Sequence, residues 1–378
     1  MPDGSPTGRS ITHYRLHDAS ELPSPALLID LDRFDRNADR VIAIAGSPDR
    51  VWPHMKTQKS ADLARRLMRR GFRRFKCSTI AEAEMLACVE APEVLVAYQL
   101  LGPHPGRLAE LARRHPGTRF STLVDDPGPL HAVSAAAAAA GATIGVMLDV
   151  DLGMHRTGIA PGGEGAIALY RLIADLPGVE PAGLHGYDGH NHQRSRDERI
   201  AACDRGTAAI KTLQAAIEAA GLPVPRRIMG GTPTFPCHAR HADADLSPGT
   251  CFLHDLGYAD MLPDLTFEFA GLLFTRVLSA STPGYVTFDL GNKAIAADPP
   301  GERGRFLAID GARTLIHNEE HWLLAVSPDL RFRVGEEHYV IPRHVCPCVA
   351  LHRQFYAVQD GRVQATYEVT ARDRALTV

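Results

Sequence analysis

A lysine in the stretch PHMKTQKS, Lys56, lies at the end of a short strand-like run. At the end of a strand of a parallel barrel, a side chain points into the barrel mouth, where functional groups gather. A primary amine held there can bond the carbonyl carbon of a cofactor and later exchange protons with a substrate. Taken alone, however, a lysine is more often a solvated surface residue, so this interpretation needs support from the rest of the chain.

Glycine-rich turns follow two later strand-like runs, at Gly230-Gly231-Thr232 and at Pro248-Gly249-Thr250. Glycine lets backbone N–H groups approach a phosphate closely, and the loops after the last strands of a barrel commonly form a phosphate site. Either turn alone is explained as well by simple chain reversal. Together, on consecutive strands, they favour a phosphate site.

Basic and aromatic side chains follow the middle strand-like runs. Arg156 lies in DVDLGMHRTG at 149–158, where a fixed cation could act on a cofactor ring or bind a carboxylate, or could simply cap a surface loop. Tyr187, His190 and His192 lie in HGYDGHNH at 185–192. Because histidine is the usual proton carrier at neutral pH, His190 or His192 is the candidate base. Clustered histidines can also be solvated surface residues.

A candidate metal pair, His344 and Cys346, lies in RHVCPC at 343–348. On an extended strand, side chains two residues apart face the same side and can share one ion. Imidazole and thiolate suit zinc, with manganese as an alternative, and so few ligands leave positions open for catalysis. A buried cysteine beside a structural histidine is the competing explanation, and Glu319, Glu320 and His321 are either support for the ion or exposed charges.

Regular alternation of strand-like and helical segments indicates how these residues are positioned. Eight strand-like runs, mostly separated by Ala-, Leu- and Arg-rich helical segments, occur at 51–57, 74–79, 94–98, 120–125, 143–150, 182–187, 226–230 and 250–254. This pattern predicts an α/β fold, a (β/α)8 barrel over 33–263, with functional groups at the carboxyl ends of the strands. From 264 to 378 the pattern changes to alternating runs broken by Gly, Pro, Asp and Asn, which predicts an all-β domain. The lead and strand at 1–32 are expected to pack with that domain.

The composition excludes several classes of protein. The 378 residues, 45% hydrophobic and 22% charged, are typical of a compact globular chain of two domains. A net charge of -3 with interspersed signs gives no basic patch for nucleic acid, so small-molecule partners are expected. No apolar run suits a membrane span or a secretion signal, and seven dispersed cysteines do not form a disulfide pattern, which together predict a cytoplasmic protein with free thiols.

In combination and in order, the motifs resemble those of one enzyme family. The match covers residues 22–369 and rests on SPALLIDLD, PHMKTQKS, STIAEAE, DVDLGMHRTG, GYDGH, GGTPT, SPGT, EEH and RHVCP. The chain resembles the D-threonine aldolase and D-serine dehydratase family, fold-type III pyridoxal-phosphate enzymes related to the barrel domain of alanine racemase.

The resemblance implies roles for the residues named above. Lys56 would be the Schiff-base lysine, and His190 would remove the proton of the substrate hydroxyl. The cofactor would also be bound by His54, Arg156, Tyr187, Gly230, Gly231, Thr232, Gly249 and Thr250, and a divalent metal by His344 and Cys346. A homodimer acting on D-amino acids is implied as well.

The reaction is expected to be aldol cleavage of D-threonine to glycine and acetaldehyde. Aldolases of the family tend to carry Asp as the second metal ligand and dehydratases Cys, so Cys346 departs from the aldolase pattern. D-serine dehydratase and D-3-hydroxyaspartate lyase therefore stay as alternatives. A racemase is less consistent with the sequence, because the β domain has no matching tyrosine motif and the metal motif would go unexplained. A non-enzymatic cofactor carrier would have no use for the β domain.

Overall fold

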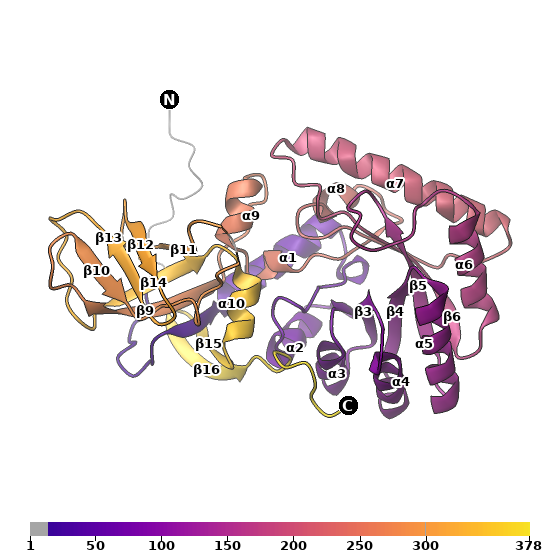
Figure 1. Ribbon diagram of the computed structural model, residues 1–378, viewed down its shortest axis with the longest axis horizontal. Coiled ribbons are helices and arrows are strands. Elements are labelled where there is room, and N and C mark those ends of the chain that lie inside the picture. The colour runs from indigo at the N-terminus through magenta and orange to yellow at the C-terminus, as the bar shows by residue number, and fades with distance from the viewer. Residues whose placement is uncertain (1–13, 299) are drawn as a thin grey trace. The chain divides into compact units, whose positions relative to one another are not determined.

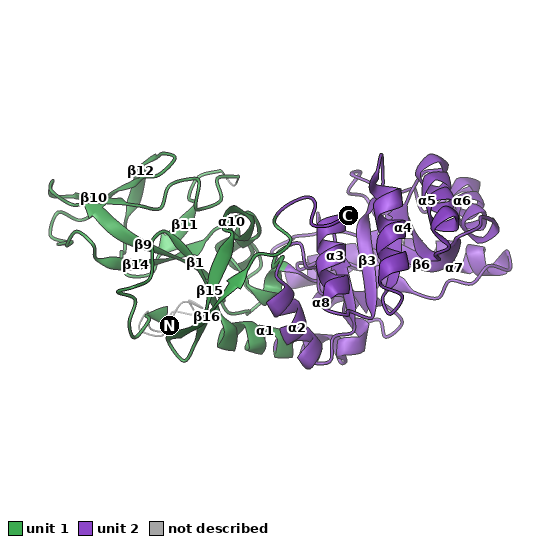
Figure 2. Ribbon diagram, turned by 90° about the horizontal axis from the view of Figure 1, so that it is seen from below, with its two compact units in different colours: residues 1–39, 57–59, 250–372 green, residues 40–56, 60–249, 373–378 purple. Residues whose placement is uncertain are grey.

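The computed structural model describes residues 14–298 and 300–378, so the expected N-terminal lead lies largely outside the described residues. The chain divides into two compact units, coloured separately in Figure 2. The barrel unit comprises Arg40–Lys56, Ser60–Gly249 and Asp373–Val378. The β unit comprises the described residues up to Asp39, Thr57–Lys59 and Thr250–Arg372.

Seven parallel strands form the sheet of the barrel unit, in sequence order from β2 to β8. They are β2 (Arg74–Cys77), β3 (Glu93–Gln99), β4 (Arg119–Val124), β5 (Ile144–Asp151), β6 (Val179–Tyr187), β7 (Arg227–Met229) and β8 (Asp245–Leu246). Isolated bridges pair Val51 with Leu246 and His54 with Lys76, so residues 51–54 lie between β8 and β2 and close the ring. The predicted α/β barrel architecture is confirmed.

Helices connect these strands and cover the outside of the sheet (Figure 1). They are α2 (Ala61–Arg69), α3 (Ile80–Cys88), α4 (His104–Arg114), α5 (Pro127–Ala140), α6 (Glu164–Asp175), α7 (Arg196–Ala219) and α8 (Phe235–His238). Their ends follow from sequence: the side chain of Thr79 accepts a hydrogen bond from Glu82 N at the start of α3, and Gly141 ends α5 in the left-handed conformation. The crossover after β7 contains only the four-residue helix α8.

Three expected strands are wrong in detail. Residues 250–254 are not a strand but begin with the 3-10 helix η3 (Thr250–Phe252), and the eighth strand is the two-residue β8, which is too short to leave a periodic pattern. Residues 51–57 form only bridges and a turn, in part because Pro53 has no N–H for a ladder. Residues 343–348 are not extended, because helix α10 (Val345–Leu351) begins there and tolerates Pro347 in its first turn, where N–H groups have no partner within the helix.

A nine-stranded sheet forms the centre of the β unit. Its strands are β1 (Ala26–Asp30), β9 (Gly271–Ser279), β10 (Tyr285–Phe288), β11 (Gly304–Phe306), β12 (Arg313–His317), β13 (Trp322–Ala325), β14 (Glu337–Pro342), β15 (Gln354–Gln359) and β16 (Arg362–Glu368). Strand β1 pairs antiparallel with β9 and parallel with β15. Helices α1 (Leu31–Ala45), α9 (Leu256–Met261) and α10 and the 3-10 helix η2 (Pro48–Arg50) complete the elements of the described residues.

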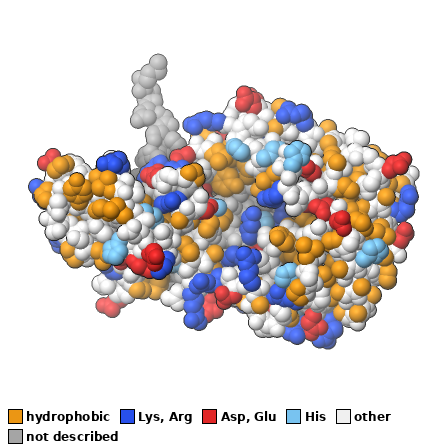
Figure 3. Space-filling view, viewed as in Figure 1, with side chains coloured by type: hydrophobic (Ala, Val, Ile, Leu, Met, Phe, Trp, Pro, Cys, Tyr) orange, Lys and Arg blue, Asp and Glu red, His pale blue; other side chains and the backbone are white. Residues whose placement is uncertain are grey.

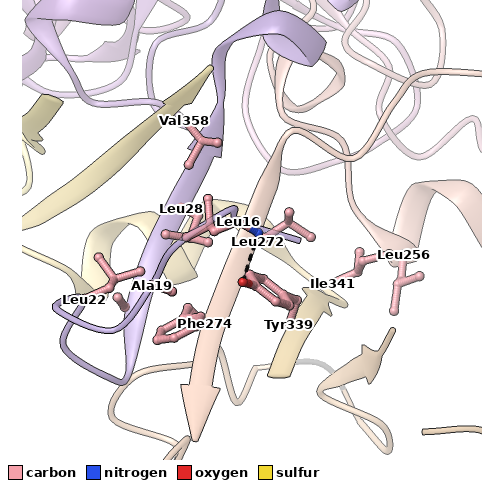
Figure 4. Close-up of a cluster of buried hydrophobic side chains, with 11 residues drawn as sticks. Leu16, Ala19, Leu22, Leu28, Leu256, Leu272, Phe274, Tyr339, Ile341 and Val358 are labelled. Atoms are coloured by element: carbon pink, nitrogen blue, oxygen red, sulfur yellow. Dashed lines mark hydrogen bonds between the residues drawn. The ribbon is translucent and has the colours of Figure 1, made fainter. Parts of the chain in front are cut away.

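Each unit has its own hydrophobic core. In the β unit, Leu28, Phe274 and Tyr339 lie in a buried cluster that also takes in Leu16, whose backbone N–H donates to the Tyr339 hydroxyl (Figure 4). In the barrel unit, Trp52, Leu123 and Ile228 pack together inside the ring. Within the described residues, no helix combines the length and the apolar character that crossing a membrane requires. On the face in view, Lys and Arg side chains alternate with Asp and Glu side chains (Figure 3).

Candidate functional site

The carboxyl ends of the parallel strands carry most of the expected cofactor residues of the barrel unit. Lys56 lies in the turn that follows the His54 bridge to β2, and it is exposed within an otherwise buried run. His54 is buried, with Nε2 3.3 Å from the Ser78 hydroxyl. Burial, together with the charges of Lys56 and Lys76, holds the pKa of His54 well below its usual range, so this imidazole is neutral.

Two basic side chains lie near an aromatic ring at this end of the barrel. The guanidinium carbon of Arg156 is 4.8 Å from the centroid of the Tyr187 ring, and Nζ of Lys76 is 5.6 Å from it. Both distances are within the range of cation–π attraction. The structure therefore brings Arg156 and Tyr187 together, as the sequence predicts, and adds Lys76.

The two glycine turns are joined to each other by a hydrogen bond. The backbone N–H of Gly249 donates to the Thr232 hydroxyl at 3.2 Å. Gly230 has a φ of +74°, which disfavours other residues, and a Cβ on Gly231 would lie 2.8 Å from Cε2 of Tyr187. The backbone thus approaches the aromatic ring so closely that only glycine fits.

These features fit pyridoxal phosphate. A primary amine, an aromatic ring, a glycine-lined cradle and two further basic side chains, Lys76 and Arg156, occur at one end of one barrel, which is the set that a phosphorylated aromatic aldehyde requires. Lys56, Tyr187 and Arg156, with the turns at 230–232 and 249–250, would hold it.

Sequence reasoning missed a buried polar chain beneath this end of the barrel. Nζ of Lys76 lies 2.8 Å from Nε2 of His185 and 3.0 Å from the Ser247 hydroxyl, and Nδ1 of His185 lies 2.6 Å from Oδ1 of Asp149. Burial and the nearby Lys56 charge lower the pKa of Lys76 to about 7. A lysine inside the apolar run RFKC, and an aspartate inside IGVMLDVD, were the features of the sequence that could have indicated it.

A second missed cluster lies under the loops that carry His190 and the first glycine turn. Asp188 is fully buried and accepts hydrogen bonds from the Thr234 hydroxyl at 2.6 Å and from His238 Nε2 at 2.8 Å. Although burial opposes it, the bonds from His238 and Thr234 lower the pKa of Asp188. Asp188, Cys203 and His238 are the one group of three metal-type side chains in the described part of the chain whose ligand atoms lie within 4.8 Å of one another. Since the direct bond between Asp188 and His238 satisfies both groups, the cluster is explained without an ion.

The candidate base His190 lies beside the loop after β5. A Cβ on Gly153 would be 3.6 Å from Nε2 of His190, and Nδ1 of His190 is buried with no hydrogen-bond partner among the described residues. His192 is exposed. His190 is therefore the better placed of the two candidates to accept a proton.

The candidate metal pair lies at the start of α10 in the β unit, where His344 is the N-cap and Cys346 is in the first turn. Nδ1 of His344 lies 2.6 Å from Oδ2 of Asp298, and Sγ of Cys346 lies 3.1 Å from the Thr57 hydroxyl and 3.4 Å from the Thr250 hydroxyl. Although burial opposes it, hydrogen bonds to Cys346 and Asp298 raise the pKa of His344 to about 9. The donor set fits a divalent metal, because a carboxylate on one imidazole nitrogen leaves the other as a ligand beside a thiol.

Asp298 and Thr57 were not predicted from sequence. Glu319 and Glu320 are exposed and form ion pairs with Lys293, and His321 is exposed. Of the two explanations that the sequence leaves open for these three residues, exposed charge is the one that the structure supports.

Comparisons with known proteins agree in the family they indicate. Residues 29–254 match the family model "Alanine racemase, N-terminal domain", and residues 270–358 match "Putative serine dehydratase domain". The chain is 29% identical to a D-threonine aldolase of Arthrobacter sp over 361 residues, 93% of each chain. It is 27% identical to a D-threo-3-hydroxyaspartate dehydratase of Delftia sp. (strain HT23), over 91% of this chain and 96% of the relative. The crystal structure of D-threonine aldolase from Filomicrobium marinum superimposes with a TM-score of 0.86 at 31% identity, covering 93% of this chain and 96% of that one.

Proposed function

Because the chain belongs to the D-threonine aldolase and D-serine dehydratase family of fold-type III pyridoxal-phosphate lyases, we propose that it cleaves β-hydroxy D-amino acids as a metal-dependent aldolase. The proposed reaction converts D-threonine to glycine and acetaldehyde: the Cα–Cβ bond breaks, the β-hydroxyl loses a proton and Cα gains one. Similarity to the two D-threonine aldolases over nearly the full length of the chain supports this choice.

The single observation that carries the proposal is a contact of Cys346. Its Sγ lies 3.1 Å from the hydroxyl of Thr57, and Thr57 directly follows Lys56 in the sequence. The residue that follows the proposed Schiff-base lysine in sequence thus contacts a proposed metal ligand. This contact supports a reaction in which the amino acid is held covalently through the cofactor on Lys56 and an ion binds its hydroxyl group.

The side chains have distinct tasks in this proposal. Lys56 holds the cofactor and returns a proton to Cα, while Arg156 and Tyr187 orient the ring. Bound pyridoxal phosphate supplies an electron sink for the pair left on Cα, and a metal on His344 and Cys346 makes the β-hydroxyl more acidic. His190, with a ring nitrogen that has no partner among the described residues, receives the hydroxyl proton.

A dehydratase is the second candidate, and Cys346 favours it, because a thiolate in this position is the pattern expected of the family's dehydratases. In that case the β-oxygen leaves Cβ and the products are a 2-oxo acid and ammonia. A dehydratase acting on D-threo-3-hydroxyaspartate is among the relatives.

Product analysis separates the two candidates. Holoenzyme with added zinc or manganese is incubated with D-threonine, D-serine, D-3-hydroxyaspartate and their L-forms, and the products are identified by mass. Glycine with an aldehyde is expected from the D-forms. Formation of a 2-oxo acid and ammonia without glycine would show that the dehydratase is correct.

Chemical trapping tests the proposed residues independently of the substrate. Borohydride reduction of the protein with pyridoxal phosphate should label the peptide containing Lys56, and Lys56→Ala should lose the label, whereas Lys59→Ala, three residues away, should keep it. His344→Ala and Cys346→Ala should lose turnover and bound metal while keeping the visible absorption of the cofactor. A variant that stays fully active without metal would refute the metal role.

Three further properties belong to the same proposal. The native metal is zinc or manganese, which elemental analysis of the purified protein tests. The assembly is a homodimer, which light scattering tests by mass. The compartment is the cytoplasm, which fractionation of the source cells tests.

A further inference from the structure

The buried amine of Lys76 takes no part in the proposed reaction, yet it lies at the centre of the barrel unit's polar network. It is 2% exposed and bonds to His185 on β6 and to Ser247, which follows β8. Ser247 in turn donates its hydroxyl proton to the backbone carbonyl of Gly230 at 2.8 Å. Lys76 therefore links the ends of β2, β6 and β8. Ser247 connects it to both glycine turns, because Ser247 bonds to Gly230 and directly precedes Pro248.

The donors and acceptors of this network can be assigned. Because Asp149 accepts from Nδ1 of His185, Nε2 of His185 carries the lone pair and accepts from Lys76. The Ser247 hydroxyl donates its hydrogen bond to the Gly230 carbonyl oxygen and accepts one from Lys76. A neutral amine has two N–H donors, and both are used. Protonation adds a third N–H, for which the described residues offer no acceptor.

The charged groups that face Lys76 come from four elements. The charges are Lys56 in the segment 51–56, Asp149 on β5, Arg156 in the loop after β5, and Asp188 directly after β6, and the titratable but neutral groups are His54, His185 and Tyr187. Burial, Lys56 and Arg156 disfavour the ammonium form, while the two carboxylates favour it. The resulting pKa of about 7 leaves Lys76 mostly neutral at pH 8 in the protein without ligand.

We propose that Lys76 is the proton-accepting charge partner of the cofactor site, taking up a proton when a phosphorylated pyridine compound binds at the barrel mouth. This inference rests on the proposed cofactor site. A bound anion attracts the ammonium form, offsets the repulsion from Lys56 and Arg156, and supplies an acceptor for the third N–H. By linkage, a ligand that favours the protonated form must draw a proton from solution. Binding is then strengthened as the pH falls from about 9 toward 7.

Isothermal titration calorimetry tests this proposal without involving the reaction. Pyridoxine 5'-phosphate is the probe, because it has no aldehyde and cannot bond Lys56. Titrations in buffers of different ionisation enthalpy give the number of protons taken up. At pH 8 the parent protein should take up close to one proton more than Lys76→Met, and at pH 5.5, where Lys76 is already charged, the difference should vanish.

Substitutions separate this role from a structural one. Lys76→Met should weaken binding at pH 7 by about 10- to 100-fold and lose the extra proton. Lys76→Arg, charged at every pH, should keep most of the affinity but also lose the extra proton. Lys211→Met, a control at a partly exposed position on α7, should change neither quantity. Circular dichroism checks that each variant is folded.

The outcomes are distinguishable. Equal proton uptake by the parent and Lys76→Met at pH 8 would overturn the inference while leaving the cofactor site intact. Failure of the parent itself to bind pyridoxine 5'-phosphate would overturn the proposed cofactor site and this inference together.

Discussion

Asp188→Ala should destabilise the barrel unit strongly, although Asp188 contacts neither the proposed cofactor nor the substrate. Its carboxylate is fully buried and accepts short bonds from two side chains that are also fully buried, Thr234 and His238. Removing it leaves both donors without a partner. Breaking a buried charged pair by deleting one member costs about 3–5 kcal/mol, and we expect a loss in this range.

The pH dependence of this loss follows from the sign of the pKa shift. The pKa of Asp188 is lowered in the folded protein, so its ionised form contributes stability above the unfolded-state pKa of about 3.9. That contribution disappears as the pH falls through the lower, folded-state value. The difference between parent and Asp188→Ala should therefore be constant from pH 6 to 8 and shrink below about pH 4.

Urea unfolding followed by circular dichroism measures the effect. Asp204→Ala is the matched control, because Asp204 lies on α7 and bonds to Arg240 and His241 at 3.3 Å from a partly exposed position. An exposed ion pair of this kind contributes at most about 1 kcal/mol. If Asp188→Ala costs no more than Asp204→Ala, the reasoning from burial is refuted. A loss that grows rather than shrinks below pH 4 would refute the reasoning from ionisation.

Two other substitutions test the cofactor cradle and the metal pair. Gly231→Ala should weaken binding of pyridoxal phosphate by tenfold or more, because the new methyl group would lie 2.8 Å from Cε2 of Tyr187. Gly162→Ala is the control, because a methyl group there would have no atom within 4 Å. Equal affinities of the two variants in an absorbance titration would contradict this prediction. Asp298→Ala should lower metal affinity by about 10- to 100-fold in chelator competition, because the His344 ring loses the carboxylate that orients it, whereas Glu319→Ala should have no effect.

Local patterns were enough to predict the architecture but not every strand. The alternation of short apolar runs with helical segments predicted the barrel, and the change of pattern after residue 264 predicted the β sheet. The prediction of a strand at 250–254 was wrong, because the eighth strand is β8, which is two residues long and has no periodicity to detect. Likewise, HVCPC at 344–348 resembles an extended run, but the same residues can begin a helix. Pro347 fits there because the first N–H groups of a helix have no partner within the helix.

The expected chemical residues all lie in motifs, and the missed ones are residues whose role is revealed only by what they contact in the folded chain. Lys76 and Asp149 occupy ordinary strand positions and Asp188 directly follows β6, and only the placement of β2, β5 and β6 in one curled sheet reveals what they contact. Asp298 is separated from His344 by 46 positions. A buried polar side chain is recognised by its partner, and a single sequence does not specify partners at such separations.

Placement of charge, rather than its total, makes the barrel mouth suitable for an anion. The chain has a net charge of -3, yet Lys56, Lys76 and Arg156 lie close enough for the charges of Lys56 and Arg156 to disfavour the ammonium form of Lys76. Keeping like charges together costs stability unless a ligand of opposite sign offsets the repulsion. The carboxylate of Asp149 partly compensates through His185, but its bonds to Thr157 and His185 direct it away from the ligand. A phosphorylated ligand would offset this repulsion, and the proposed binding is therefore expected to be coupled to proton uptake.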